Sequence, residues 1–343
     1  MQNIRSLTIN ELEDFILANN EKKFRAKQIF EWIWKKNVNT FSEITSISKE
    51  LRSLLELNFT LKSVVISSIQ KSKDKTIKFA FQLPDNNFVE GVLIPSKDRI
   101  TACISTQAGC TFQCRFCATG KMGFIRNLSK SEIYEQVFLL NEQSLKEHKK
   151  GLTNIVIMGM GEPLVNYDNT LAAINLICST EGLAMSPTRI TLSTSGVAKM
   201  IMKLADDNVK FNLAISLHSA NNLKRDYLMS INKTNNLQKL TEAIIYFHEK
   251  TQTRVTFEYL LLGNYNDSLQ DAKELAEFCK SFPCKINVIE FNSVDKSEFS
   301  KSSEDNLNQF VKFLESKNII VNIRRSKGKD IDAACGQLAN KKH

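Results

Sequence analysis

Residues 109–120 of the chain read GCTFQCRFCATG, and Cys110, Cys114 and Cys117 stand there in the pattern C-x3-C-x2-C. A [4Fe–4S] cluster is held by cysteine thiolates and ordinarily takes four of them. Three thiols this close together can hold three corners of a cluster and leave one iron open to a small molecule. The run therefore predicts an iron–sulfur centre that acts chemically on a bound ligand.

Two other roles for these thiols fit the sequence less well. A zinc site normally uses four ligands from paired cysteines or a cysteine–histidine mixture, and the nearest histidine, His148, lies far along the next predicted helix. A disulfide framework is typical of small secreted domains, whereas this chain has 343 residues and only 8 cysteines. Zinc or structural thiols stay open as the alternative interpretation of the triplet.

From residue 100 onward, apolar runs typical of strands alternate with helical patterns. The expected strands are ITACIST, TNIVIM, RITLST, KFNLAISL, RVTFEYLL and KINVIEF. A first helix is predicted to begin at Ser129, where Glu132 three residues later completes a capping box, and others are predicted over residues 169–179, 237–250, 269–281 and 304–316. Six strands joined by helical crossovers indicate parallel pairing in an α/β barrel or open barrel.

Small and polar residues follow several of these strands. The cysteine loop follows the first strand, and the second ends in GMGEP, with Gly161 allowing close backbone approach and Glu162 offering a carboxylate to an ammonium group. The later ends are Ser193, then Ser216, Leu217 and His218, and finally Glu290, Phe291 and Asn292. Since the chemistry of such folds gathers at the carboxyl ends of the strands, these residues are predicted to ring one mouth.

The first hundred residues are predicted to add two smaller parts. Residues 1–60 indicate short helices, among them FRAKQIFEWIWKK, which mixes aromatic and basic residues. In residues 61–97, TIKFAFQL and FVEGVLIP flank a Pro-Asp-Asn-Asn turn and predict a hairpin. Glu90 interrupts the second strand of this hairpin. Since a buried carboxylate is costly, Glu90 is a functional candidate.

Five further cysteines lie outside the triplet. Cys103 falls in the first strand of the alternating region, and Cys335 lies in the C-terminal run DIDAACGQL. From the residues alone, either is a fourth cluster ligand or a small buried side chain. Cys178, Cys279 and Cys284 have apolar neighbours and are predicted to be structural.

Charge and composition indicate a class of binding partner and a cellular compartment. The formal net charge of +9 and the pI of about 9.0 fit a nucleic-acid partner, and equally a generally basic surface. No apolar run approaches the length of a membrane span. The N-terminus, MQNIRSLTINELEDF, lacks the apolar stretch of a signal peptide. With so many free thiols, these features favour the cytoplasm.

Longer motifs resemble one known family. ISTQAGCTFQCRFCATGKMGF, GMGEPL, RITLSTSG, AISLH, CKINVIEFN and RRSKGKDIDAACGQLA are similar to the RlmN/Cfr family of radical S-adenosylmethionine (SAM) enzymes, over most of the chain. The resemblance implies a partial (β/α)6 radical-SAM barrel over residues 98–325. It also implies a helical RNA-facing domain over residues 1–60, an accessory β segment over 61–97 and a C-terminal segment over 326–343.

The resemblance also implies what the site residues do. Cys110, Cys114 and Cys117 would hold the [4Fe–4S] cluster, Cys335 would carry a methyl group, Cys103 would be its partner thiol and Glu90 would accept a proton. The residues expected to line the SAM pocket are Gly161, Glu162, Ser193, Ser216, Leu217, His218 and Asn292. These roles take Cys103 and Cys335 out of consideration as fourth cluster ligands.

The activity implied is methylation of C2 of an adenosine in 23S ribosomal RNA and of the adenosine 3′ of the anticodon in tRNA. Two SAM molecules would be used per turnover, one to methylate Cys335 and one to generate a radical, with an electron-donor protein as a further partner. Arg324, Arg325, Lys327 and Lys329 are plausible RNA contacts or a solvated basic segment. Two rivals are a Cfr-type enzyme acting at C8 and a non-catalytic, metal-stabilised RNA-binding protein.

Overall fold

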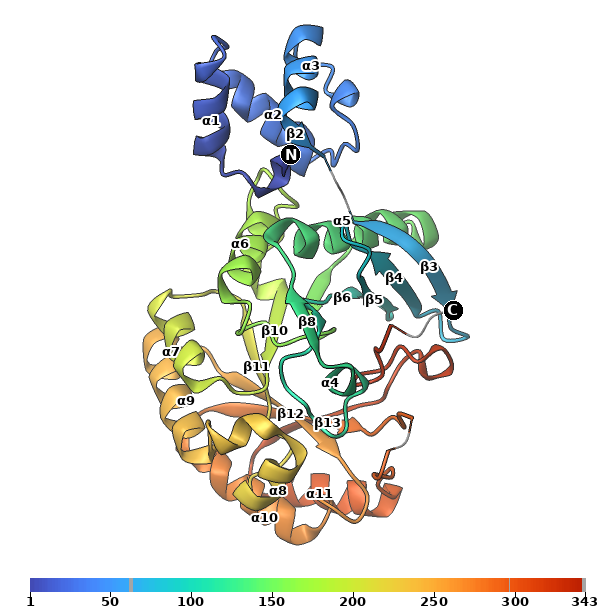
Figure 1. The fold of residues 1–343 in the computed structure, drawn as a ribbon. Helices are drawn as coiled ribbons and strands as arrows, with labels where there is room; N and C mark the ends of the chain where they lie inside the picture. The colour runs from blue at the N-terminus through green and yellow to red at the C-terminus, as the bar shows by residue number, and fades with distance from the viewer. Residues whose placement is uncertain (62–63, 296, 341–343) are drawn as a thin grey trace.

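The computed structural model describes residues 1–61, 64–295 and 297–340, and a ten-stranded sheet organises most of them (Figure 1). The strands lie side by side in the order β14-β13-β12-β11-β10-β9-β6-β5-β4-β3. Their bounds, from β3 onward, are β3 (Val65–Lys71), β4 (Ile77–Gln82), β5 (Phe88–Pro95), β6 (Ile100–Cys103), β9 (Asn154–Ile157), β10 (Ile190–Thr194), β11 (Asn212–Ser216), β12 (Val255–Leu261), β13 (Cys284–Glu290) and β14 (Ile320–Arg324).

The strands from β6 to β14 are parallel, because a helix returns the chain to the same end of the sheet after each one. The crossover helices are α5 (Lys130–His148), α6 (Tyr167–Cys178), α7 (Ala198–Asp206), α8 (Asn222–Leu228), α9 (Leu237–Thr251), α10 (Leu269–Phe278) and α11 (Glu304–Ser316). The six predicted strands are thus confirmed as β6 and β9–β13. The parallel layer gains a seventh member, β14, which was not predicted.

Local sequence explains where these elements begin. The Ser129 hydroxyl oxygen accepts a bond from the Glu132 amide, and the Glu132 carboxylate accepts one from the Ser129 amide, so the predicted capping box is confirmed. Strand β12, VTFEYLL, is buried at every position, as expected for a central parallel strand covered on both faces. Glu258 sits in the middle of this buried run, and such a carboxylate needs a partner.

The predicted hairpin is confirmed as β4 and β5, which pair antiparallel from Ile77↔Leu93 to Gln82↔Phe88. It is not a separate accessory layer, however. Strand β5 also pairs antiparallel with β6, with Val92 opposite Cys103, so β3–β5 extend the same sheet. This register brings the strand that carries Glu90 beside the strand that carries Cys103.

Short elements frame the cysteine loop. Strands β7 (Gln107–Gly109) and β8 (Phe124–Asn127) pair antiparallel, and α4 (Ala118–Met122) lies between them in the sequence. Cys110 follows β7 directly, and Cys117 is the residue before α4. These elements were not predicted, because three to five residues are too few to show a periodic pattern.

The helical N-terminal part is confirmed as α1 (Ile9–Ala18), α2 (Phe24–Trp34) and α3 (Lys49–Asn58), with β1 (Gln2–Asn3) and β2 (Phe59–Thr60) pairing in parallel. Figure 1 shows this part at one end of the molecule, next to α5. Trp34 packs edge-to-face on Tyr134 of α5, with ring centroids 5.4 Å apart. Within the described residues, no helix combines the length and the apolar character needed to cross a membrane.

Candidate active site

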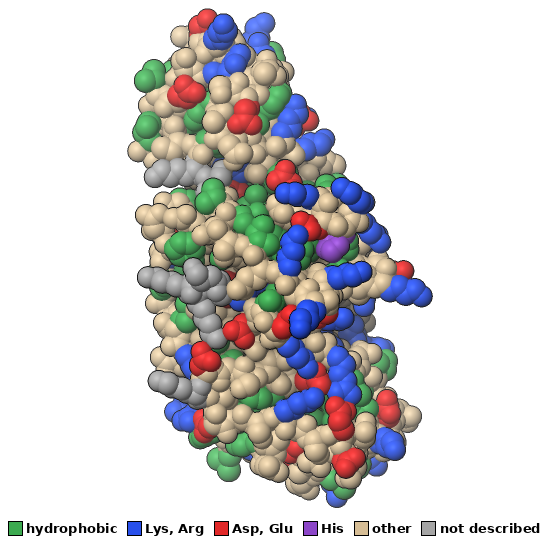
Figure 2. All heavy atoms as spheres, turned by 90° about the vertical axis from the view of Figure 1, so that its right-hand side faces the viewer, with side chains coloured by type: hydrophobic (Ala, Val, Ile, Leu, Met, Phe, Trp, Pro, Cys, Tyr) green, Lys and Arg blue, Asp and Glu red, His purple; other side chains and the backbone are tan. Residues whose placement is uncertain are grey.

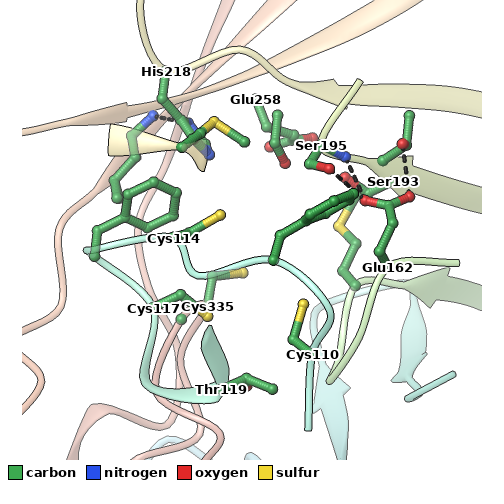
Figure 3. Close-up of a pocket in the computed structure, with 18 of the residues that line it drawn as sticks. Cys110, Cys114, Cys117, Thr119, Glu162, Ser193, Ser195, His218, Glu258 and Cys335 are labelled. Carbon is green, nitrogen blue, oxygen red and sulfur yellow. Dashed lines mark hydrogen bonds between the residues drawn. The ribbon is translucent and has the colours of Figure 1, made fainter. Parts of the chain in front are cut away.

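A cavity of about 170 Å³ lies at the carboxyl ends of the parallel strands and is lined by residues from most of them. Nine of the predicted site residues line it, as Figure 3 shows in part: Cys110, Cys114, Cys117, Gly161, Glu162, Ser193, Ser216, His218 and Cys335. The sulfur atoms of the four cysteines face the same space, across from Glu162 and Ser193. The structure therefore brings most of the predicted ring together, but Leu217, Glu290, Phe291 and Asn292 do not line this cavity.

The three clustered cysteines have the free thiol groups and the burial that are typical of metal ligands. All three are free thiols on one loop. Burial raises the pKa of Cys110 to about 12. Burial is also the larger cause that raises the pKa of Cys114 well above its usual value, and the neighbouring thiols add to this effect. Buried thiolates are unfavourable unless positive charge is supplied, and a metal centre supplies it.

The number and sequence spacing of these thiols are those expected for three of the four ligands of a cluster. Among the described residues, no group of three or more His, Cys, Asp or Glu side chains converges on a single metal position. Each iron of a four-iron cluster binds its own thiolate, so the three sulfurs need not meet at one point. Gly120 supports the loop, because a side chain there would lie within 2.9 Å of the Cys114 amide nitrogen.

Glu162 is the most heavily hydrogen-bonded group of the cavity. Its Oε1 accepts bonds from Thr194 Oγ1 (2.7 Å) and the Leu164 amide (3.1 Å), and its Oε2 accepts from the amide (2.8 Å) and hydroxyl (2.7 Å) of Ser195. Burial raises its pKa, and these donors oppose the effect. The carboxylate thus fastens the loop after β9 to the end of β10, in addition to facing the cavity.

His218 is held as a neutral ring in an unusual backbone conformation. Its φ of 56° lies in the left-handed region, and its Nδ1 accepts a hydrogen bond from the Leu260 amide at 2.9 Å. Burial, followed by the charge of Arg225, lowers its pKa to about 3. The ring stacks edge-to-face on Phe116 of the cysteine loop, with centroids 4.7 Å apart.

Sequence reasoning missed two residues that shape the site, Arg225 and Glu258, and expected a third, Arg324, to contact RNA or solvent. Arg225 is fully buried and donates to the carbonyls of Ser195 (2.6 Å), Leu217 (3.1 Å) and Ser216 (3.3 Å), which ties the ends of β10 and β11 together. Glu258 and Arg324 line the cavity and form an ion pair at 3.1 Å. Of these three residues, only Glu258 could have been found from the sequence, because its charge interrupts the apolar run of β12.

Cys335 reaches the cavity from the C-terminal segment. It is exposed toward this space, yet protein atoms surround it and their desolvation raises its pKa, while Arg324 acts in the opposite direction. The carbonyl of Gly336 accepts a bond from the Ala118 amide at 2.7 Å, which places Cys335 beside the cysteine loop.

Cys103 does not line the cavity but lies just behind it. It is the last residue of β6 and is buried. Burial raises its pKa to about 12, and Cys335 also raises it, whereas a hydrogen bond with the Met158 main chain and the charge of Arg324 lower it. The two thiols and the guanidinium therefore lie within electrostatic reach of one another.

Comparisons with known proteins agree with this geometry. Residues 104–279 match the model of the Radical SAM superfamily, and residues 2–61 match the Ribosomal RNA large subunit methyltransferase N-terminal domain. The chain is 55% identical to "Probable dual-specificity RNA methyltransferase RlmN" of Cytophaga hutchinsonii, over 98% of this chain and 93% of that protein. The chain belongs to the RlmN family of radical SAM methyltransferases.

Further relatives support this membership. A protein of the same description from Flavobacterium johnsoniae is 48% identical over 99% of this chain and 97% of its own. The crystal structure of a radical SAM methyltransferase from Sphaerobacter thermophilus matches with a TM-score of 0.93 and 36% identity, over 99% of this chain and all of that one. The superfamily implies a [4Fe–4S] cluster and SAM, and the three-thiol loop beside a cavity fits both.

Two predicted pocket residues of this RlmN-family chain lie outside the cavity lining. Leu217 is completely buried, so only its main chain, held by Arg225, serves the site. Asn292 is buried behind the rim, and its Nδ2 donates to Ser326 Oγ at 2.9 Å. Their predicted contact with SAM stays a prediction.

The basic run that precedes Cys335 is engaged within the protein. Arg324 pairs with Glu258, while Arg325 and Lys329 both pair with Glu290, at 2.8 and 2.9 Å. Burial raises the pKa of Glu290, but bonds from Lys329, Lys301 and Arg325 outweigh this and hold it well below its usual value. These three cations therefore have acidic partners, which weakens the expectation that they serve chiefly as RNA contacts.

Glu90 also lies outside the cavity lining, under the C-terminal segment. It is 1% exposed in β5, forms an ion pair with Lys78 of β4 at 3.4 Å and accepts a hydrogen bond from the Ala339 amide at 2.8 Å. It is thus close to the segment that carries Cys335, although it does not face the open space directly.

Proposed function

We propose that this chain methylates C2 of adenosines in RNA, with 23S ribosomal RNA and tRNA as substrates, through a methyl group carried on Cys335. The observation that carries the proposal is that Cys335 and Arg324 line the same cavity as the three-cysteine loop, with the Cys103 thiol near enough for its charge to act on Arg324. The two substrate classes rest on the relatives' description as dual-specificity RNA methyltransferases and on the rRNA methyltransferase N-terminal domain.

The chemistry explains why two thiols and a cluster loop belong together. C2 of adenine is an electron-poor carbon between two ring nitrogens, so it does not displace a methyl group from SAM as a nucleophile would. Bound at Cys110, Cys114 and Cys117, a reduced cluster would supply the electron that cleaves SAM and so makes radical chemistry available. The cavity wall formed by Gly161, Ser216 and His218 would position SAM.

The protein's own groups would perform the remaining steps. The Cys335 thiolate takes a methyl group from a first SAM, and Arg324 favours that thiolate. Radical chemistry would remove one hydrogen atom from the S-methyl group, and the remaining CH2 would bond to C2. Glu90 would accept the C2 proton as one electron is given back to the cluster. The Cys103 thiolate would then attack the Cys335 sulfur and form a disulfide, while the CH2 carbon keeps the electron pair of the broken sulfur–carbon bond and takes up a proton, so that the methylated base leaves. An external dithiol reductant returns both thiols by exchange.

RNA would bind mainly through its phosphates. A target base inside folded RNA must be unstacked before it can enter a cavity, and Lys and Arg contacts to phosphate supply most of the binding. Figure 2 shows Lys and Arg side chains gathered along one side of the face that it presents. Exposed lysines at the β3–β4 turn and at the end of α5 add positive charge to the protein surface: Lys73, Lys75, Lys146, Lys149 and Lys150.

Nucleoside mass spectrometry tests the proposal. Unmodified 23S rRNA and tRNA are incubated with anaerobically reconstituted enzyme, SAM and a reductant, and 2-methyladenosine is expected in both RNAs. Cys335→Ala should form none, whereas Cys178→Ala, which removes a half-buried thiol of α6 outside the cavity lining, should keep the activity. Cys103→Ala should accumulate a covalent protein–RNA adduct.

The other outcomes reassign the activity. 8-Methyladenosine would place the chain with enzymes that act at C8. Methylation of only one RNA class would remove the dual specificity, and product from Cys335→Ala would remove the methyl-carrying role. A protein that binds zinc instead of iron and sulfide, and forms no methylated nucleoside, would fit a non-catalytic RNA-binding protein.

A further inference from the structure

A buried ion pair connects both ends of the loop that carries Cys335. The ammonium group of Lys78 lies 3.4 Å from Glu90 Oε1 and 3.5 Å from the carbonyl oxygen of Asp332. The other oxygen of Glu90 accepts the Ala339 amide at 2.8 Å. Asp332 precedes Cys335 and Ala339 follows it, so one Lys–Glu pair fixes both sides of residues 332–339.

The burial of this pair makes the arrangement specific. Lys78 is 3% exposed and Glu90 is 1% exposed. Lysine is almost never buried this deeply without a partner, and a buried charge persists only when its remaining hydrogen-bonding capacity is used. Here that capacity goes to main-chain groups of the C-terminal segment. Lys78 is also too deeply enclosed to contact an RNA phosphate, so its charge serves the interior.

The rest of the loop is tied down around Cys335. Before it, the Gly328 amide donates to Asp74 Oδ2 at 2.9 Å, and Ser72 Oγ donates to Asp330 Oδ1 at 2.6 Å. After it, Thr119 Oγ1 donates to the Leu338 carbonyl at 2.6 Å. Strands β3–β5 therefore form a support along which the C-terminal segment lies, as Figure 1 shows.

We propose that Lys78 is a positioning residue for the Cys335 thiol: with Glu90 it clamps Asp332 and Ala339, and so fixes where Cys335 lies between the cluster loop and Cys103. This proposal rests on the proposed function for its catalytic consequence but not for its structural claim. The thiol must meet SAM, the RNA base and Cys103 in turn. A loop released at either end would present it to each of them less often in a reactive geometry.

The test compares Lys78→Met with Lys78→Arg, which keeps a cation at the same place. Lys210→Met is the control, because Lys210 is exposed and its ammonium group donates to Oδ1 of the nearby Asn208. We expect Lys78→Met to lower kcat on the order of 10²-fold, since misplacement of reacting groups by about 1 Å has effects of that size. The KM for RNA should stay unchanged, and Lys78→Arg should recover most of kcat.

A second measurement needs neither RNA nor activity. Hydrogen exchange of the Ala339 amide, followed by mass spectrometry of the full reconstituted protein, should be on the order of tenfold faster in Lys78→Met, because local opening exposes this amide. Lys78→Arg and Lys210→Met should exchange like the unmodified chain. If Lys78→Met fails to fold, Glu90→Gln can be used in its place, because it keeps an acceptor oxygen but removes the charge. The Ala339 amide should also exchange faster in Glu90→Gln.

The two measurements separate the possible failures. Unchanged exchange at Ala339 in the folded variants overturns the clamp, even if turnover falls. Faster exchange with unchanged kcat overturns the positioning role. If the unmodified protein methylates no adenosine but Ala339 exchanges faster in Lys78→Met, the clamp stands and the proposed function fails.

Discussion

Three buried carboxylates lie in or beside the cavity, and each is satisfied in a different way. Glu90 uses a lysine and a main-chain amide, Glu162 uses hydroxyls and amides, and Glu258 uses Arg324 together with the Asn287 side chain at 2.8 Å. Because an ionised carboxylate has about four acceptor sites, Glu162 has little capacity left. A ligand ammonium group would therefore have to share Glu162 with the Ser195 hydroxyl.

The buried His218 makes the protein sensitive to acid. Its folded pKa of about 3 lies below the unfolded value of 6.5, so below pH 6.5 the unfolded state binds more protons and stability falls as the pH falls, until about pH 3. From pH 7 to pH 5 the loss should be about 2 kcal/mol. Urea unfolding at several pH values measures it.

The matched variants isolate this one group. His218→Asn keeps an acceptor for the Leu260 amide but does not titrate, so its stability should depend less on pH over this range. His248→Asn removes a histidine of α9 whose Nδ1 lies 3.1 Å from the Thr253 carbonyl, away from the cavity, and should keep the acid sensitivity. Equal pH slopes in all three proteins would show that His218 is not the responsible group.

At the residue scale, the chain alone revealed groups with a local signature. The cysteine spacing, the glycines and Glu162 after β9, and the charge of Glu90 in a strand could be found this way. Arg225 and Arg324 could not, because their partners are brought to them by the sheet: Arg324 meets Glu258, 66 residues earlier in the chain. A basic residue in a polar run gives no sign of such a distant carboxylate.

At the element scale, the turn after β9 depends on glycine. Gly161 has a φ of +96°, and a side chain there would lie 2.5 Å from Gln107 Cβ. Gly161→Ala combines backbone strain with a steric clash and should cost about 2–4 kcal/mol of unfolding free energy. Because the Glu162 amide donates to Gln107 Oε1 at 2.9 Å, the clash should also displace Glu162.

Gly123→Ala is the control for that substitution. Gly123 has a φ of +78°, but a side chain there would have nothing within 4 Å. It should therefore cost about 1–3 kcal/mol, for backbone strain alone and without a clash. Denaturant unfolding of both variants gives the comparison, and equal losses would show that contact with Gln107 is not the cause.

Periodicity predicted the elements that are long and covered on one or both sides. The predicted helix over residues 304–316 matches α11, Glu304–Ser316, and RVTFEYLL contains all of β12. Strand β14 was missed because Ile320–Arg324 is an edge strand with exposed positions and no continuous apolar run. The pairing of β5 with β6 could not be predicted either, because the sequence of a strand does not show which strand it will pair with.

At the scale of the whole molecule, Arg5 joins the N-terminal helices to the barrel. It is fully buried and donates to Glu135 Oε1 of α5 at 2.8 Å, to Asn37 Oδ1 at 2.7 Å and to the Val38 carbonyl at 2.9 Å. Arg5→Met would leave Glu135 buried without its cation. We expect a loss of about 3–5 kcal/mol of unfolding free energy, measured by chemical denaturation.

Two further variants complete this test. Arg5→Met combined with Glu135→Gln removes both charges and should recover much of the loss. Lys23→Met breaks the pair between Lys23 and Glu13, in which the lysine side chain is 65% exposed, and should cost no more than about 1 kcal/mol. If Arg5→Met costs as little as Lys23→Met, the interface does not depend on this ion pair.

The two ends of the Cys335 loop also limit how far its thiol can travel. An extended chain spans at most about 3.3–3.6 Å per residue. While Asp332 is held at Lys78, the three residues to Cys335 allow roughly 10–11 Å of travel from that point. Under the proposed function, SAM, the target base and Cys103 would all have to come within this radius. The RNA, rather than the cysteine, would then make the long movement in each catalytic cycle.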